Sequence, residues 1–278
     1  TKATLDKDYS LHHYNSVTRA QGKKGWEKYS NTLKPGELYL IAMDNDLNVS
    51  TFCFKKANGA TIGSPSEMTL QAYPAYPSSD PINANWNGVG NSTLVYRNVS
   101  FSGNKVQVFN HADDAFQVYP VSEVSFVVGS AFFAQSEGEE TLTLTEATDP
   151  AFLRTPARKR AATMEEMNVR IGKDENSYTD QIFLSAEDDA LDSYEIAHDL
   201  VKMSYNTPKV AQMAINAYGV SLCDAELPWN ASNEAIFPLT ITAPKAGTYT
   251  IYLNGEAQSA LLLYQNGHYV CDLTAGAY

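Results

Sequence analysis

The chain has 278 residues, of which 44% are hydrophobic, 11% aromatic and 19% charged. This composition supports a substantial core and excludes a disordered chain or a coiled coil. The formal net charge of -12 disfavours a nucleic-acid or anionic-membrane partner, because phosphate groups repel an acidic protein. The longest nearly apolar run, residues 124–134, is much shorter than the roughly 20 residues that a membrane helix requires, so no transmembrane segment is expected.

Short runs of β-branched and aromatic residues recur along the chain between Gly, Pro, Asn and Asp, which predicts antiparallel strands. Three Asn-Gly pairs, at Asn58, Asn254 and Asn266, stand between such runs and predict tight hairpins. The fold class is therefore expected to be all-β. The predicted strands are residues 38–42, 49–54, 106–109, 116–119, 124–128 and 142–144, then 169–171, 182–184, 237–241, 249–253, 261–264 and 269–273.

An aromatic segment in the first half is the candidate contact surface. Tyr73 and Tyr76 each precede a proline, and Trp86 follows in an Asn-rich stretch. Flat aromatic faces beside amides can stack on sugar rings or on a partner chain. The alternative is that the Tyr-Pro pairs lie extended against a sheet edge while Trp86 fills the core.

Residues 145–167 combine two prolines with a basic cluster and show no strand periodicity, which is typical of an interdomain connection. We place the boundary near residue 155. The expected architecture is two antiparallel β-sandwich, jelly-roll-like domains, residues 1–154 and 155–278.

One segment of the second half departs from the strand pattern. In residues 191–203 the apolar positions recur at spacings of three and four among charged neighbours. That period predicts an amphipathic helix of about three turns. The second domain is therefore expected to contain one short helix.

The motifs of common catalytic and metal sites are not found in the sequence. Neither G-x-S-x-G nor H-E-x-x-H occurs, and the nearest calcium-loop match, residues 44–55, has Val49 and Lys55 where glycine and glutamate belong. The acidic residues 187–189 are explained by the start of the predicted helix. We expect no catalytic residue, no metal and no cofactor, and hence no enzymatic activity.

The three cysteines, Cys53, Cys223 and Cys271, form no metal-binding cluster and allow at most one disulfide. A Cys223–Cys271 bridge is possible if their strands meet. We interpret all three as small buried hydrophobic residues.

Several short motifs, read in order, resemble a region near the C-terminal end of large exported surface proteins of the Bacteroidetes. The order carries the resemblance, because each motif alone consists largely of strand and turn residues. The motifs are residues 33–41 (LKPGELYLI), 86–91 (WNGVGN), 131–135 (AFFAQ), 180–184 (DQIFL), 192–195 (DSYE), 199–203 (DLVKM), 213–216 (MAIN), 238–241 (PLTI) and 246–251 (AGTYTI).

The resemblance implies a non-catalytic tandem β-sandwich within a larger, adhesin-like protein that is secreted or held at the outer-membrane exterior. Type IX secretion is the export system of such proteins, but the export route of this chain stays open. Its expected role is structural or adhesive, with a protein or a glycan as the partner. Two alternatives remain open. One is a carbohydrate-binding module that uses Tyr73, Tyr76 and Trp86, and the other is an accessory domain of a secreted hydrolase.

Overall fold

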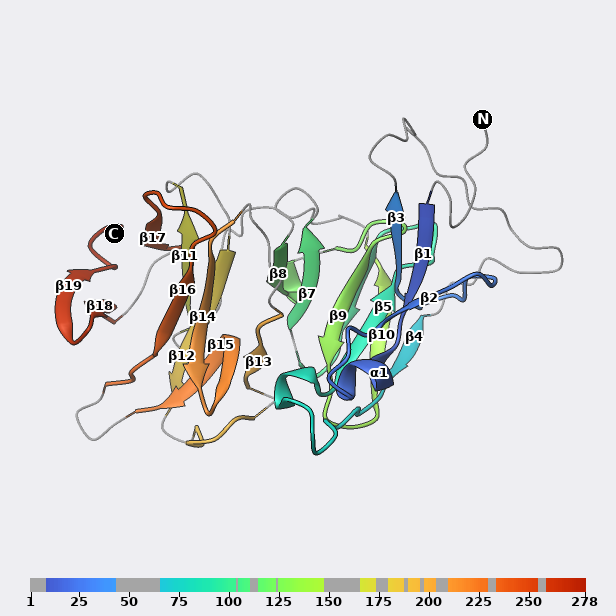
Figure 1. The fold of residues 1–278 in the computed structure, drawn as a ribbon, viewed down its shortest axis with the longest axis horizontal. Helices are drawn as coiled ribbons and strands as arrows, with labels where there is room; N and C mark the ends of the chain where they lie inside the picture. Colours follow the sequence, from blue (N-terminus) through green and yellow to red (C-terminus); the bar gives the residue numbers. More distant parts are fainter. Residues whose placement is uncertain are drawn as a thin grey trace. The chain divides into compact units, whose positions relative to one another are not determined.

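The chain folds into two compact units (Figure 1), here called unit 1 and unit 2. Unit 1 consists of Thr1–Val106 and Pro120–Arg154, and unit 2 consists of Gln107–Tyr119 and Thr155–Tyr278. The expected boundary near residue 155 lies outside the described residues, but the short segment of unit 2 comes from the first half of the sequence. The computed structural model describes residues 9–43, 66–103, 105–110, 115–123, 125–147, 166–173, 180–187, 190–195, 198–203, 210–229, 234–254 and 259–278.

Unit 1 is built from antiparallel strands, as the alternating apolar pattern predicts. Its first sheet has the order β2-β1-β3, its second the order β4-β10-β6, and β5 pairs with β9. One helix, α1, follows β1 (Figure 1). The bounds are β1 Tyr9–Tyr14, α1 Ser16–Ala20, β2 Trp26–Lys28, β3 Tyr39–Met43, β4 Glu67–Leu70, β5 Trp86–Gly90, β6 Arg97–Ser100, β9 Ala131–Gln135 and β10 Glu140–Glu146, with 3-10 turns at Pro81–Asn83 and Val121–Glu123.

Aromatic side chains hold the sheets of unit 1 together. The ring of Phe133 on β9 lies 4.9 Å from that of Tyr14 on β1, edge to face, and also meets the rings of Trp26 and Trp86. Edge-to-face pairs are a favoured aromatic geometry and add to the free energy gained by burying apolar area. The cluster joins the β1 sheet to the β5–β9 pair and forms the core of the unit.

Unit 2 is centred on one large sheet with the order β16-β14-β15-β12-β11-β17, in which β13 also pairs with β15. The hairpin β18–β19 forms a separate two-stranded sheet, and β8 with most of β7 also belongs to this unit. The bounds are β7 Lys105–Asn110, β8 Ala115–Pro120, β11 Met167–Gly172, β12 Asp180–Glu187, β13 Leu200–Val201, β14 Gln212–Ala217, β15 Val220–Pro228, β16 Leu239–Thr242, β17 Thr250–Leu253, β18 Leu262–Gln265 and β19 His268–Asp272.

Strand β15 is the centre of this sheet and is buried along most of its length. Its pairing with β12 is parallel, with Phe183 opposite Asp224, whereas the sheet's other pairs are antiparallel. The burial extends to two acidic residues of the strand, Asp224 and Glu226. The predicted all-β class is confirmed, and the expected antiparallel pairing holds for the other described strand pairs whose register is known.

The helix predicted at residues 191–203 is wrong. Leu200–Val201 forms strand β13, and the described residues 190–195 are irregular; residues 196 and 197 lie outside the description. Leu200, Val201, Lys202 and Met203 are all buried, whereas an amphipathic helix would turn part of such a run toward solvent. Apart from two 3-10 turns, the only helix in the described residues is α1 in unit 1.

One predicted hairpin can be checked in full. Asn266 and Gly267 have φ angles of 52° and 79° and join β18 to β19, as a type I′ turn requires. Gly255 and the pair Asn58–Gly59 lie outside the described residues, as does the predicted strand at residues 49–54. The strand predicted at residues 124–128 is reduced to a single bridge between Phe126 and Arg97. In the described part of the chain, no helix has the length and apolar character needed to cross a membrane.

Candidate functional site

Side-chain amides of β5 hold the candidate segment, residues 71–77, in place. The Asn87 Oδ1 atom accepts a hydrogen bond from the Gln71 N–H at 3.0 Å, and Asn87 Nδ2 donates to the Gln71 carbonyl at 3.0 Å. A neighbouring strand would offer the same donor and acceptor from its backbone. The buried Asn87 side chain therefore takes the place of a neighbouring strand for residue 71, where the chain leaves β4.

Asn85 holds the next part of the same segment. Its Oδ1 accepts a hydrogen bond from the Tyr73 N–H at 2.9 Å, and its own N–H donates to the Tyr73 carbonyl at 2.8 Å. The φ angle of Asn85 is 65°, a left-handed conformation that asparagine tolerates better than most residues. Further along, the Tyr76 N–H donates to the Ala20 carbonyl of α1 at 3.1 Å. The backbone of the segment is thus fixed at three points, and it runs beside the helix.

An open pocket of about 410 Å³ lies between this segment and α1. Its two largest exposed apolar side chains are Tyr76, with 47% of its surface accessible, and Val17, with 46%. Its lining contains no His, Cys, Asp, Glu, Lys or Arg, so its only polar side-chain groups are two tyrosyl hydroxyls. The lining residues are Val17, Ala20, Ala72, Tyr73, Pro74, Ala75, Tyr76 and Pro77.

Polar contacts at the base of α1 position its side of the pocket. Asn15 caps the helix by accepting the Thr18 N–H at 3.1 Å. The Glu27 carboxylate on β2 accepts from Thr18 Oγ1 at 2.6 Å and from Asn15 Nδ2 at 2.9 Å. These hydrogen bonds, that of Thr18 first, lower the pKa of Glu27. They tie a five-residue helix to the neighbouring strand, and such a short helix would not be stable alone.

Trp86 is not part of the pocket. Its side chain is fully buried, its Nε1 donates to the Ile82 carbonyl at 2.9 Å, and its ring meets Phe133. A side chain with no accessible surface cannot stack on a sugar or a partner chain. The prediction of Trp86 as a contact residue is wrong, and the alternative in which it fills the core holds. Tyr73 and Tyr76 are brought together at the pocket.

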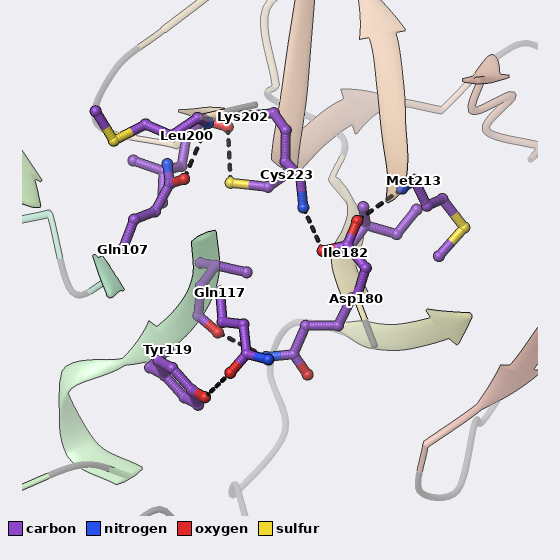
Figure 2. A network of polar contacts seen from close by, with 12 residues as sticks. Gln107, Gln117, Tyr119, Asp180, Ile182, Leu200, Lys202, Met213 and Cys223 are labelled. Atoms are coloured by element: carbon purple, nitrogen blue, oxygen red, sulfur yellow. Dashed lines mark hydrogen bonds and ion pairs between the residues drawn. The ribbon is translucent and has the colours of Figure 1, made fainter. Parts of the chain in front are cut away.

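Unit 2 contains a second concentration of polar groups, a buried network shown in Figure 2. Lys202, just after β13, forms an ion pair with Asp180 at the start of β12, and both side chains are almost completely buried. The other carboxylate oxygen of Asp180 accepts the Met213 N–H at 2.6 Å. Burial raises the pKa of Asp180 against the opposing effects of the Lys202 charge and the backbone hydrogen bonds.

The hairpin strands β7 and β8 join the same network. Gln107 donates to the Val201 carbonyl through Nε2 at 2.5 Å and accepts the Met203 N–H at 2.9 Å. Gln181 donates to the Val118 carbonyl at 2.6 Å, and the Tyr119 hydroxyl donates to Gln117 (Figure 2). Burying polar groups does not destabilise the fold only if their hydrogen bonds are satisfied. These glutamines therefore fix the hairpin within unit 2.

An acidic cluster lies just before β13 in the sequence, around Asp199. Asp199 accepts the N–H groups of Glu195 at 2.9 Å and Glu226 at 3.0 Å, and burial raises the pKa of its carboxyl against these two bonds. His198 Nδ1 pairs with the buried Glu226 carboxylate at 3.0 Å. The described residues include no group of three or more His, Cys, Asp or Glu side chains arranged to hold a metal ion. The acidic runs at residues 44–46 and 188–189 lie outside that part of the chain.

The two cysteines that are described do not form the bridge that the sequence allows. Cys223 and Cys271 are both free thiols. Cys223 is fully buried on β15, and its Sγ lies 3.4 Å from the Leu200 carbonyl, whereas Cys271 is half-buried on β19. The interpretation as a buried hydrophobic residue holds for Cys223. Cys53 lies outside the described residues.

Sequence reasoning located the two tyrosines but not the groups that hold them. Asn85 and Asn87 were indistinguishable from other loop asparagines, and nothing in the sequence placed α1 beside residues 71–77. Comparison with known proteins gives no match, whether to a family model, to a curated protein sequence or to a solved structure. The resemblance to Bacteroidetes surface proteins stays a prediction.

Proposed function

We propose that this chain is a non-catalytic binding module of a larger exported protein, and that the pocket between residues 71–77 and α1 contacts a partner protein. The observation that carries the proposal is the pocket's lining, which is apolar and presents Tyr76 and Val17 to solvent. Partially exposed tyrosines beside prolines are typical of surfaces that bind extended protein segments.

The lining favours a protein over a sugar. Sugar hydroxyls need several side-chain donors and acceptors, whereas this pocket offers two tyrosyl hydroxyls and otherwise aliphatic or proline surface. The burial of Trp86 removes the third aromatic face that a carbohydrate-binding module would use. An extended peptide with apolar side chains meets the pocket's chemistry better, because its burial gains free energy from apolar area.

The test uses a library of random peptides displayed on phage and selected against the full chain. Enriched peptides are expected to be apolar, and Tyr76→Ala is expected to weaken their binding by about tenfold or more, since an exposed tyrosine anchor contributes over ~1 kcal/mol. Tyr264→Ala is the matched control, because Tyr264 is a similarly exposed tyrosine on β18 in unit 2.

Two results would contradict the assignment. One is enrichment of peptides whose binding is equal for Tyr76→Ala and the unsubstituted chain. The other is binding on a glycan array that disappears with Tyr76→Ala, which would move the function to carbohydrate recognition.

Location at the cell surface is tested separately. Labelling of intact producing cells with a membrane-impermeant amine reagent should modify the full-length protein, and an unlabelled protein would argue against it.

A further inference from the structure

The buried pair Lys202–Asp180 in unit 2 is used by neither the pocket nor the proposed binding function. Only 4% of the Lys202 side chain and 1% of the Asp180 side chain are accessible to solvent. The pair lies among fully buried apolar residues, including Ile182, Met213 and Cys223 (Figure 2). Two charges in such a place are costly unless their hydrogen bonds are complete.

Among the residues that the structure describes, the Lys202 side chain has fewer hydrogen-bond acceptors around it than its ammonium group has donors. An ammonium group carries three N–H donors. Among the described residues, Nζ of Lys202 has one acceptor, Oδ1 of Asp180. The backbone N–H of Lys202 donates to the Ser221 carbonyl at 2.8 Å. A secondary amide nitrogen carries a single N–H and no charge, so it would suit this site better than an ammonium does.

The two oxygens of the Asp180 carboxyl have different partners. One oxygen faces Nζ of Lys202, and the other is held by the Met213 N–H at 2.6 Å. A backbone N–H in that place would stabilise the negative charge that develops on a carbonyl oxygen during addition to the carbon. Bulk water is excluded, which favours the uncharged amine and acid over the ion pair.

From this arrangement we propose that Lys202 and Asp180 form an intramolecular isopeptide bond. A proton passes from the ammonium to Oδ1, and the amine lone pair then attacks Cγ of Asp180. The C–N bond forms, the negative charge rests on Oδ2 beside the Met213 N–H, and the C–Oδ1 bond breaks. Oδ1 leaves as water with the two protons that come from Nζ. The products are one amide and one water molecule, and no oxidant, reductant or further reactant takes part.

The bond would join β12 to the segment after β13, closing a loop between positions 22 residues apart. The same segment is hydrogen-bonded to Gln107, which donates to the Val201 carbonyl and accepts the Met203 N–H. A covalent closure here would prevent the β13 segment from leaving the sheet without complete unfolding of the loop.

The experiment is the intact mass of the purified, fully denatured chain, followed by mapping of its proteolytic peptides. The expected mass is lower than the sequence mass by one water molecule, and one branched peptide is expected to contain both Lys202 and Asp180. Lys202→Met is expected to restore the full sequence mass of that variant. Lys245→Met, at an exposed lysine in unit 2, is the control and should keep the deficit.

A full sequence mass with two separate, linear peptides would overturn the proposal and leave the pair as an ion pair. A water deficit that maps elsewhere, or that persists in Lys202→Met, would overturn it equally. Because the peptide map of the unsubstituted chain decides the question alone, failure of a variant to fold leaves the test intact. Peptide binding at the pocket in unit 1 is measured independently, so the two proposals can fail separately.

Discussion

Asn87 shows how single side chains shape unit 1. Its amide satisfies both backbone groups of Gln71 and also donates to the Asn85 carbonyl at 3.1 Å. Such bonds between side chain and backbone allow a segment to follow a strand without belonging to the sheet. The surface of residues 73–77 is held in place by the buried amide of Asn87 and the half-buried amide of Asn85.

His198 provides a prediction at the same scale. Burial by itself lowers the pKa of His198, but the hydrogen bond and charge of Glu226, with the charges of Glu195 and Asp199, outweigh burial and raise it. The folded state therefore binds the His198 proton more tightly than the unfolded state does. The stability that His198 protonation adds to the folded state is fully present below the ordinary histidine pKa of about 6.5. It is lost as the pH rises through the folded-state pKa.

The measurement is urea unfolding of the unsubstituted chain and of His198→Gln at several pH values. The substitution should cost stability in mildly acidic buffer, and the cost should shrink toward alkaline pH. His268→Gln, at an exposed histidine on β19, is the control substitution. A cost that is constant or grows with pH would disprove the linkage.

Sequence reasoning reached some of these residues and missed others for identifiable reasons. Tyr73 and Tyr76 stood out because Tyr-Pro pairs are conspicuous. Trp86 lay in the same loop-rich stretch, and sequence alone could not show that its neighbour in space is Phe133, far along the chain. Asp180 and Lys202 lie in two of the motifs that carry the resemblance, but nothing marked them as partners of each other, because local sequence cannot show that two charges will be buried together.

At the scale of elements, β5 approaches the chain before β3 so closely that it needs glycine. The Gly90 N–H donates to the Gly36 carbonyl at 2.8 Å, and a Cβ at position 90 would lie 2.4 Å from the Glu37 carbonyl oxygen. The obstructing atom belongs to the backbone, which cannot simply rotate away. Close backbone approach is a common reason for a glycine inside a strand.

Gly90→Ala should therefore destabilise the chain by about 1–3 kcal/mol, the usual cost of overpacking. Gly138→Ala is the control, because a Cβ there would meet nothing within 4 Å. Urea unfolding monitored by tryptophan fluorescence reports the difference. Equal midpoints for the two variants would show that β5 and the Glu37 backbone are not in this contact.

The strand and hairpin patterns were predicted where residue types match their local structure. The Asn266–Gly267 turn was predicted correctly because both residues tolerate a positive φ. The turn between β14 and β15 uses Tyr218 and Gly219, with φ angles of 54° and 77°, and tyrosine carries no turn signal. At residues 191–203 the helical spacing of apolar residues was misleading, because burial on β15 decided the structure.

At the scale of the whole molecule, unit 2 depends on a segment from the first half of the sequence. Gln107 and Val118, on the hairpin strands β7 and β8, are almost completely buried and bond to the segment after β13 and to β12. Short-range sequence patterns carry no information about such distant pairings. A domain boundary drawn only from the composition near residue 155 could not assign this hairpin.

A fragment of residues 155–278 should consequently be much less stable than the same residues in the full chain. Without the hairpin, the Met203 N–H and the Gln181 Nε2 group lose their hydrogen-bond partners, and a buried unpaired polar group costs about 1–3 kcal/mol. Circular dichroism during urea unfolding measures this, and a synthetic peptide of residues 103–122 should restore part of the stability. A fragment that unfolds cooperatively at the midpoint seen in the full chain would contradict the assignment.

The two units thus carry different proposed roles. Unit 1 presents an apolar pocket held by asparagine side chains, and unit 2 contains the buried Lys202–Asp180 pair within a large sheet. The pocket residues and the buried pair share no side chain, so each proposed role rests on its own observations.

Hydrogen–deuterium exchange of the full chain, with and without a saturating peptide from the phage selection, tests the binding function most directly. The account predicts slower exchange in α1 and in residues 71–77, with little change in β18 and β19. Slower exchange confined to unit 2, with α1 and residues 71–77 unaffected, would contradict it.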